Sequence, residues 1–376
     1  MPRERFRNTG DASFFGALVY DRVVPQGHFL RQLRDLLDWE ALTQEWVSLY
    51  KGGAEYGPPP YHPALVLKML FLAYLYNLSE RQVEEYVNDS LSAKYFLGLG
   101  ADALAPDSTT LTVFKGRLLK AKGTHPLEML LHKVVAQAQE KGIAFGRIQV
   151  VDSVHTVAQV DQEQEDRRRR QGEGPRDPGA RWGTKGARRV RGPDGKGEKR
   201  PKHFFGYKAH VSLNAENGLI TSLVVTSGEV YDGHYLRPLV VQDVAQGLPV
   251  EVYAGDRGYD DGENHEFLWQ RGLKSALKLK GTRTQKRDPN KEPWLKLLAE
   301  PSYQAGLKER YKVERKFGEA KLFHGLGRCR YLGLDRYRIQ GYLTALTLNF
   351  KRVVKLLTGV GFRDSSPWSR SRVIAA

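Results

Sequence analysis

Cysteine is nearly absent from this chain, and two other features are missing. The 376 residues include one cysteine, Cys329, so neither an intrachain disulfide nor a multi-cysteine zinc site can form. The most apolar stretch, residues 65–76, contains Lys68 and is shorter than the ~20 residues that a membrane-spanning helix needs. Residues 1–14 lack the apolar centre of a secretory signal. We therefore expect a soluble protein of a reducing cytoplasm.

Acidic residues are scarce relative to basic ones. Lysine and arginine number 59 against 43 aspartates and glutamates, which gives a formal net charge of +16 at pH 7. Such an excess favours a polyanionic partner, with nucleic acid as the first candidate and an anionic membrane surface as the second. The alternative is a basic surface that is merely well solvated.

The positive charge is concentrated in an insert at about residues 163–203. The insert contains a run of four arginines: Arg167, Arg168, Arg169 and Arg170. Lysine and arginine then recur among glycine and proline through Lys202, with too few apolar residues for the segment to fold by itself. It is either a solvated loop or an arm that contacts DNA phosphates and becomes ordered on DNA. The excess of cations over acids favours the arm.

Residues 1–140 have the spacing of a helical region. Residues 64–76 are apolar nearly all round, which predicts a buried helix. Ser79 and Gln82 match a capping box at the start of the next helix. A helix-turn-helix that reads DNA over residues 64–88 is one interpretation, and simple packing of the apolar first helix is the other.

From residue 141 the pattern becomes mixed. Alternation of apolar and polar residues predicts a strand over residues 205–213, and Asn217-Gly218 predicts a hairpin turn after it. Short apolar runs predict further strands at residues 148–152, 219–226, 252–256 and 275–279. Helical spacing recurs at residues 236–245, 263–270, 309–323 and 339–356. We therefore predict an α/β region over residues 141–358 and a mobile tail over residues 359–376.

Two of the short apolar strands end on an aspartate, Asp152 and Asp256. A carboxylate beside a buried strand is costly unless it is paired or binds a metal. Hard cations such as Mg²⁺ prefer carboxylate oxygens, and a pair of them can activate a hydroxyl and stabilise the leaving oxygen in phosphodiester chemistry. An aspartate at a strand end can equally serve as a turn or helix-capping residue.

A third carboxylate, Glu314, lies in a basic segment with helical spacing. Residues 307, 310, 314, 317 and 321 share one face of a helix, which places Arg310 and Lys321 on either side of the acid. Cations beside a metal site would hold a phosphate in line for reaction. The alternative is an ordinary surface ion pair between Arg310 and Glu314.

Several short motifs together resemble the transposases of bacterial insertion sequences that have a ribonuclease H-like core. In the helical region these motifs are residues 61–63, 78–84, 95–99 and 106–111. In the α/β region they are Val151-Asp152-Ser153, Trp182-Gly183, residues 206–210 and residues 255–259. The group's last signature is Tyr, two residues, Arg, three residues, Glu, six residues, Lys. It is matched by Arg310, Glu314 and Lys321, with Leu307 in place of the tyrosine.

The resemblance implies a ribonuclease H-like mixed-sheet catalytic core preceded by an all-α N-terminal DNA-binding region. It implies that Asp152, Asp256 and Glu314 bind Mg²⁺, for which Mn²⁺ can substitute, and drive strand cleavage followed by attack of a 3′-hydroxyl. Arg310 and Lys321 would contact DNA phosphates near the cut. The implied partners are double-stranded DNA, as element terminal inverted repeats and as target, and a second copy of the chain in a synaptic complex. The implied setting is the bacterial cytoplasm, with the protein on the nucleoid when bound to DNA.

Two positions near the expected site allow more than one interpretation. Lys208 shares a strand face with His210, and this face either lines the site, where Lys208 would contact DNA, or is exposed to solvent. Asp232 precedes an expected helix and is expected to cap it.

Two alternatives to a transposase stay open. One is a ribonuclease H-like nuclease that cuts without strand transfer. The other is a catalytically silent transposase derivative that only binds DNA.

Overall fold

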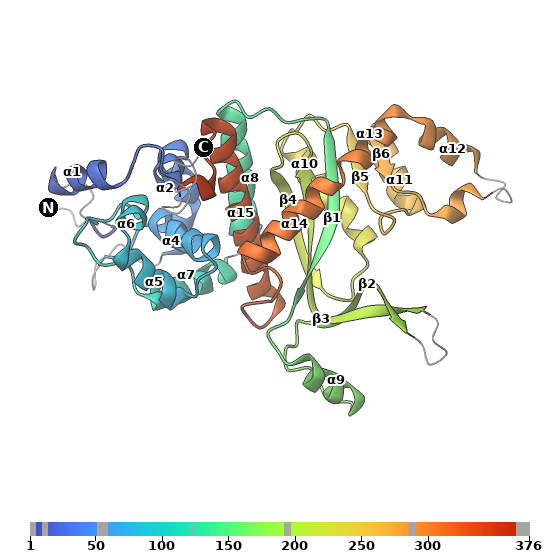
Figure 1. Cartoon of the computed structure of the whole chain (residues 1–376), viewed down its shortest axis with the longest axis horizontal. Helices are drawn as coiled ribbons and strands as arrows, with labels where there is room; N and C mark the ends of the chain where they lie inside the picture. Colours follow the sequence, from blue (N-terminus) through green and yellow to red (C-terminus); the bar gives the residue numbers. More distant parts are fainter. Residues whose placement is uncertain are drawn as a thin grey trace, which may run out of the picture. The chain divides into compact units, whose positions relative to one another are not determined.

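The computed structural model describes residues 5–9, 14–50, 59–121, 123–191, 197–285 and 291–365 (Figure 1). The chain forms two compact units, one made of Met1–Ile143 with Leu343–Ala376 and one of Ala144–Tyr342. The first boundary lies close to the expected one at residue 140. The second falls within α15 (Leu334–Thr358), a helix expected to belong wholly to the α/β region. No helix in the described ranges is long and apolar enough to cross a bilayer.

The first unit is helical, as expected for residues 1–140. Its elements are α1 (Phe14–Val23), α2 (Phe29–Leu36), α3 (Trp39–Thr43), η1 (Gln44–Leu49), α4 (Pro63–Leu75), α5 (Glu80–Asp89), α6 (Leu91–Leu97), α7 (Ser108–Lys120) and α8 (Pro126–Glu140). All 13 residues of α4 are buried, and α4 contacts α3, α5, α6 and α7. The Lys68 ammonium lies 5.3 Å from the ring centre of Trp39 and 5.6 Å from that of Phe96. These contacts favour the packing role for α4 over a DNA-reading role.

Two local predictions in this unit can be compared with the structure. The capping box at the start of α5 is present, with Ser79 N–H donating to Gln82 Oε1 at 2.9 Å and Gln82 N–H donating to Ser79 Oγ at 3.3 Å. The beginning of the expected mobile tail is packed, because the ring centre of Phe362 in η4 (Phe362–Ser365) lies 5.4 Å from those of Phe29 and Tyr76. Residues 366–376 of that tail lie outside the described residues.

The second unit is built on one mixed sheet. Its strands are β1 (Ile148–Val157), β2 (Arg181–Arg191), β3 (Gly197–Asn214), β4 (Ile220–Ser227), β5 (Val252–Gly255) and β6 (Lys274–Leu277). The C-terminal half of β3 lies between β4 and β1, and the order continues through β5 to β6. β3 is antiparallel to β1 and β4, whereas β1, β5 and β6 are parallel. This sheet, with the helical unit before it, confirms the expected ribonuclease H-like fold class.

Helices cover both faces of the sheet. They include α10 (Leu236–Ala245), α11 (Gly262–Trp269), α13 (Pro301–Glu309) and α14 (Tyr311–Phe323), whereas α12 (Glu292–Ala299) packs against α13. On one face, Val151 and Tyr253 join side chains of α10 and α11 in a buried core. On the other face, α13 approaches so closely that a Cβ on Gly306 would lie 2.5 Å from Ala276 Cβ. Because strand residues alternate between faces, the neighbours of Val151 and Tyr253 point toward the α13 side.

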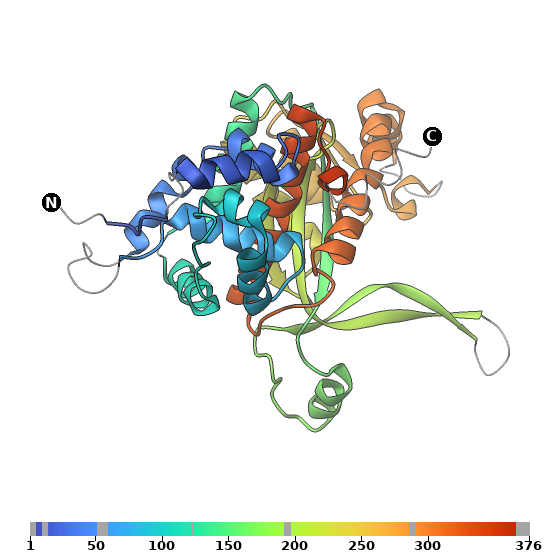
Figure 2. The same cartoon turned by 60° about the vertical axis from the view of Figure 1, so that its left-hand side comes forward.

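Three glycines let four strands meet at the base of a hairpin. A Cβ on Gly206 would lie 2.1 Å from Thr156 O, one on Gly183 2.2 Å from Gly228 O, and one on Gly228 2.5 Å from Arg181 O. From this junction β2 and the N-terminal half of β3 run on past the rest of the sheet as a two-stranded ribbon (Figure 2). Close backbone packing therefore explains why positions 183 and 206 of the motifs are glycine.

The insert at residues 163–203 has regular secondary structure in the residues that the structure describes, which argues against the solvated loop; the DNA-contacting arm stays a prediction. The arginine run lies in α9 (Gln162–Arg170), and the following residues form the β2–β3 ribbon. Asp161 caps α9 by accepting hydrogen bonds from the N–H groups of Glu163 and Gln164. Helix capping and strand pairing satisfy the backbone here, so the segment needs no large apolar core of its own. Residues 192–196, also part of the insert, lie outside the described residues.

Candidate active site

Asp152 lies in the middle of β1, not at its end as expected. The strand continues to Val157 because β1 pairs with β3 from Gln149 opposite Asn214 to Val157 opposite Gly206. The side chain of Asp152 is half-buried. It points away from the core that holds its neighbour Val151, and so toward the face that α13 covers.

Asp256 follows β5 directly, as expected. In the parallel pair of β1 and β5, Val150 is opposite Ala254, so Asp152 and Asp256 occupy equivalent positions two residues further along. The Asp256 carboxylate is held by its own turn, where the N–H of Gly258 donates to Oδ1 at 2.7 Å. A Cβ on Gly258 would lie 2.9 Å from that same oxygen, so a larger residue there would displace the carboxylate from this position.

The electrostatics of Asp152 reflect these surroundings. Burial, and then the charge of the neighbouring Asp256, raise the pKa of Asp152 to about 6. The Ser153 N–H, which donates to Oδ1 at 2.7 Å, opposes the shift, as do the charges of Lys185 and Arg310. The charges of one neighbouring carboxylate and two cations therefore act on Asp152.

The Glu314 carboxylate does not lie with Asp152 and Asp256. Its side chain is 63% exposed in the first turn of α14, and Arg310 Nη2 lies 3.8 Å from its Oε1. The helix expected over residues 309–323 forms as α14, but the single helical face expected from residue 307 to residue 321 is interrupted because α13 ends at Glu309 and α14 begins at Tyr311. Leu307 consequently belongs to α13 and Glu314 to α14. Arg310, at the junction, is the residue of this segment that acts on Asp152.

The donor set fits a divalent cation in part. Across the described ranges, no three histidine, cysteine, aspartate or glutamate side chains gather closely enough to hold a metal. Asp152 and Asp256 do fit, because Mg²⁺ is commonly bound through one or two carboxylates while keeping several waters. The repulsion that raises the pKa of Asp152 is also what a cation between the two acids would relieve. The structure thus brings two of the three expected ligands together.

Lys208 and His210 are buried, which excludes the solvent-exposed alternative. The Lys208 ammonium donates to Val230 O at 2.7 Å and to Asp232 Oδ1 at 2.9 Å. Asp232 makes no capping hydrogen bond, so its expected role as a cap is wrong and its carboxylate pairs with Lys208 instead. A DNA contact by Lys208 stays a prediction.

Two further residues lie near the carboxylates without having been identified from sequence. Tyr259 is fully buried, and its hydroxyl has no hydrogen-bond partner among the described residues. Burial raises its pKa, followed by the charges of Asp152, Asp232 and Asp256. Lys185, on β2, donates through Nζ to Ser153 O at 3.1 Å. Tyr259 lies within the motif around Asp256, a signal that could have identified it, whereas Lys185 depends on the pairing of β2 with β3.

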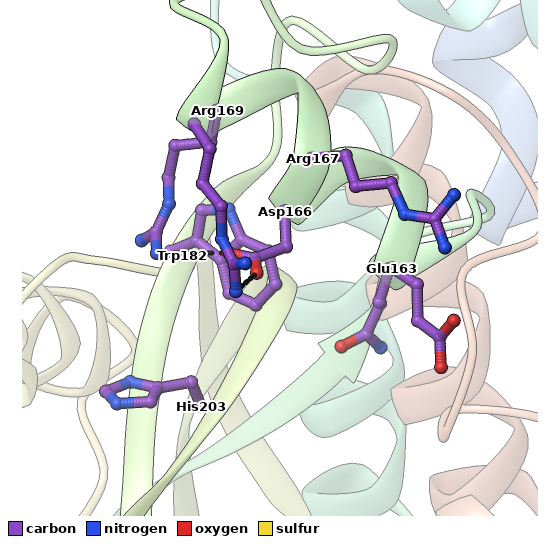
Figure 3. Close-up of a pocket in the computed structure, with 8 residues that line it drawn as sticks. Glu163, Asp166, Arg167, Arg169, Trp182 and His203 are labelled. Carbon is purple, nitrogen blue, oxygen red and sulfur yellow. Dashed lines mark hydrogen bonds and ion pairs between the residues drawn. The ribbon is translucent and has the colours of Figure 1, made fainter.

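The arginine run borders a pocket of about 580 Å³ between α9 and the ribbon (Figure 3). It is lined by Gln162, Glu163, Asp166, Arg167, Arg169, Arg170, Trp182 and His203. Asp166 pairs with Arg169 at 3.1 Å and with Arg170 at 2.6 Å, and the Arg169 guanidinium lies 5.2 Å from the Trp182 ring centre. Arg168 turns away to Glu173 at 3.4 Å. Three of the four arginines therefore face one cavity, and two of them are held by an acid.

Family models match both units of the chain. Residues 18–117 match a transposase domain of the DUF772 family, and residues 146–350 match the transposase DDE domain. The second match covers more than half of the sequence and includes Asp152, Asp256 and Glu314. The chain belongs to the DDE transposase family, whose function is DNA transposition.

Solved structures give weaker likenesses. The piggyBac transposase synaptic complex with hairpin DNA is 11% identical with a TM-score of 0.41, over 93% of this chain and 81% of that one. The Mos1 strand transfer complex is 11% identical with a TM-score of 0.21, over 85% of this chain and 84% of that one. At these scores the likeness adds nothing to what the family models show.

Proposed function

We propose that this transposase cleaves DNA strands at the ends of its element and joins the freed 3′-hydroxyl to target DNA, with Mg²⁺ or Mn²⁺ as cofactor. The observation that supports this most directly is the matched placement of Asp152 and Asp256 on adjacent parallel strands. The charge of Arg310 acts on Asp152, and Glu314 lies four residues beyond Arg310 in the next helix.

Each residue has a distinct task in this proposal. Asp152 and Asp256 hold the cation, and Glu314 completes the donor set. When bound, the cation supplies activation of the attacking hydroxyl and stabilisation of the leaving oxygen. Arg310, whose side chain is 18% exposed, offers a guanidinium that can donate two hydrogen bonds to a phosphate beside the acids. Its weak 3.8 Å contact with Glu314 leaves it available for this task.

The remaining basic residues serve DNA binding in this proposal. Lys321, Lys208 and the α9 run of Arg167, Arg168, Arg169 and Arg170 contact phosphates, and the helical unit recognises the element ends. Pairing two ends requires two copies of the chain. Such contacts make affinity fall as salt rises, with a slope near −0.9 per phosphate in a plot of log affinity against log salt. A salt-independent affinity would contradict phosphate binding.

The experiment that tests the catalytic proposal uses purified protein, DNA carrying the element ends, and Mg²⁺. Asp256→Asn is expected to bind the ends as the wild type does and to lose cleavage. Asp335→Asn, which removes a carboxylate that is 76% exposed on α15, is the matched control and should cleave normally. Equal cleavage by wild type and Asp256→Asn would contradict the site assignment.

Two outcomes would favour the alternatives. Wild-type cleavage without joining of ends would favour a nuclease. End binding without cleavage under any metal condition would favour a silent derivative.

A further inference from the structure

A group of positive side chains surrounds His155 at the end of β1. Lys321 Nζ, from α14, lies 3.4 Å from His155 Nδ1. Lys185 Nζ, from β2, donates to Ser153 O two residues away. After burial, the causes that lower the pKa of His155 to about 4 are the charges of four lysines: Lys321, Lys185, Lys202 and Lys208. Three elements of the second unit thus direct cations to one histidine.

These cations lack acidic partners, with one exception. Lys208 pairs with Asp232. Lys185, Lys202 and Lys321 form no ion pair within the described residues, and the charges that lower the pKa of Lys321 to about 8, after burial, are those of Lys185 and Lys202. Gathering like charges without an anion is unfavourable. An anion is therefore what this arrangement is suited to bind.

The local backbone contributes to this placement. The pairing of β2 with β3 shifts register between Thr184 and Ala187, which marks a bulge at Lys185. Gly186 in that bulge has φ +62°, in the left-handed region that favours glycine. A bulge re-aims the side chain it carries. Here the Lys185 side chain reaches β1, a strand with which β2 does not pair.

His155 adds a neutral donor to the group. With its pKa lowered to about 4, the imidazole is uncharged at neutral pH. The Lys321 ammonium has only donors, so Nδ1 accepts from it and the ring proton resides on Nε2. The ring is half-buried and lies 4.8 Å from that of Phe204, which limits its motion. A fixed N–H beside three ammonium groups is a suitable set of ligands for a phosphate oxygen.

We propose that His155, Lys185 and Lys202 join Lys321 in a separate anion site that holds one phosphodiester of the DNA beside the carboxylate pair. Lys185 links the two sites, because its charge acts on Asp152 as well as on His155. The identification of the anion as DNA rests on the proposed function; the anion site itself does not. Its role is to position the strand relative to Asp152 and Asp256.

The first test follows the imidazole directly in metal-free buffer with EDTA. The protein is labelled with ¹⁵N at its ten histidines and observed by NMR. The signal of His155 is assigned by its loss in His155→Gln. Pyrophosphate is expected to shift this signal to saturation. Lys185→Gln and Lys321→Gln should weaken that binding by at least about tenfold, or about 1.4 kcal/mol. Lys274→Gln, which changes an exposed lysine at the start of β6, should leave it unchanged.

The second test measures DNA binding by Asp256→Asn in EDTA, so that cleavage cannot contribute. Adding Lys185→Gln, Lys202→Gln or Lys321→Gln should each weaken duplex binding and lower its salt slope, and the three substitutions together should lower the slope by about 0.9, the value for one phosphate. Adding Lys274→Gln should not reduce it. Absence of a pyrophosphate shift at His155, or salt slopes unchanged by all three substitutions, would overturn the anion site. If pyrophosphate shifts the His155 signal and the substitutions lower the salt slope, but the wild-type protein never cleaves DNA, the proposed catalysis is overturned and the anion site is retained.

Discussion

Asp152 and Asp256 stand at equivalent positions of two adjacent parallel strands, each two residues past the paired residues Val150 and Ala254. The register of β1 and β5 therefore brings the two residues side by side, and the turn after β5 holds the Asp256 carboxylate. Arg310 lies at the junction of α13 and α14, and its charge acts on Asp152. Glu314, in the first turn of α14, is exposed and does not join the two aspartates in this structure.

The raised pKa of Asp152 predicts a pH-dependent cost to stability. The pKa of Asp152 is about 6 in the folded protein and 3.8 ordinarily. The protonated acid therefore favours the folded state fully below about pH 4, and this stabilisation is lost as the pH rises to about 6. Above that range the charged acid costs about 3 kcal/mol. Asp152→Asn should therefore be more stable than wild type at pH 7, by up to that amount, and not at pH 4.

Urea unfolding in EDTA at both pH values measures this difference. Asp335→Asn, at an exposed position, is the control. A stability difference between Asp152→Asn and wild type that is the same at both pH values would contradict the prediction.

Glu314→Gln should separate catalysis from stability. Because the side chain is 63% exposed and its ion pair is long, the free energy of unfolding should change by less than about 0.5 kcal/mol. Cleavage should fall by more than about 100-fold, since loss of an outer partner of a metal ligand already costs about 10–100-fold. Thermal unfolding and cleavage of end-bearing DNA measure the two effects. Glu292→Gln, exposed on α12, should change neither, and an active Glu314→Gln would remove Glu314 from the donor set.

Gly206→Ala should destabilise the second unit strongly. The added Cβ would lie 2.1 Å from Thr156 O, and relief requires β1 and β3 to separate at the base of the ribbon. We expect a loss of about 3 kcal/mol or more, at the upper end of overpacking effects. Gly318→Ala is the control: its Cβ meets nothing within 4 Å, and alanine favours a helix by up to about 1 kcal/mol. Denaturant unfolding that finds both variants equally stable would refute the packing role of Gly206.

Tyr259→Phe should not destabilise the protein, although the residue is fully buried. Its hydroxyl lacks a partner among the described residues, so removing it takes away an unsatisfied polar group that costs about 1–3 kcal/mol. Tyr303→Phe is the contrasting variant, because its hydroxyl accepts the Leu279 N–H at 3.1 Å and its loss should cost about 1 kcal/mol or more. Urea midpoints compare the two. A larger loss for Tyr259→Phe than for Tyr303→Phe would show that the Tyr259 hydroxyl is bonded in solution.

Much of the local structure follows from short-range patterns. The capping box at Ser79, the strand containing Tyr207 and the strand that ends before Asp256 are set by neighbouring residues, and they form where expected. The expected strand end at Asp152 is wrong because β1 is lengthened by pairing with β3, a partner distant in sequence. The regular structure of the insert at residues 163–203 was missed for a related reason. Polar strands such as β2 and β3 are stabilised by the backbone hydrogen bonds between them, and amino-acid composition does not reveal this pairing.

The sequence by itself indicated the class of this protein, through its basic charge and through the short motifs around Asp152, Asp256 and Glu314 that resemble those of DDE transposases. Only the tertiary structure decided which of these meet. The register of parallel strands brings Asp152 and Asp256 together, because hydrogen bonds between strands fix relative position in a way that residue order does not. The same is true of Lys185, which a bulge in β2 directs toward β1, where its charge acts on His155.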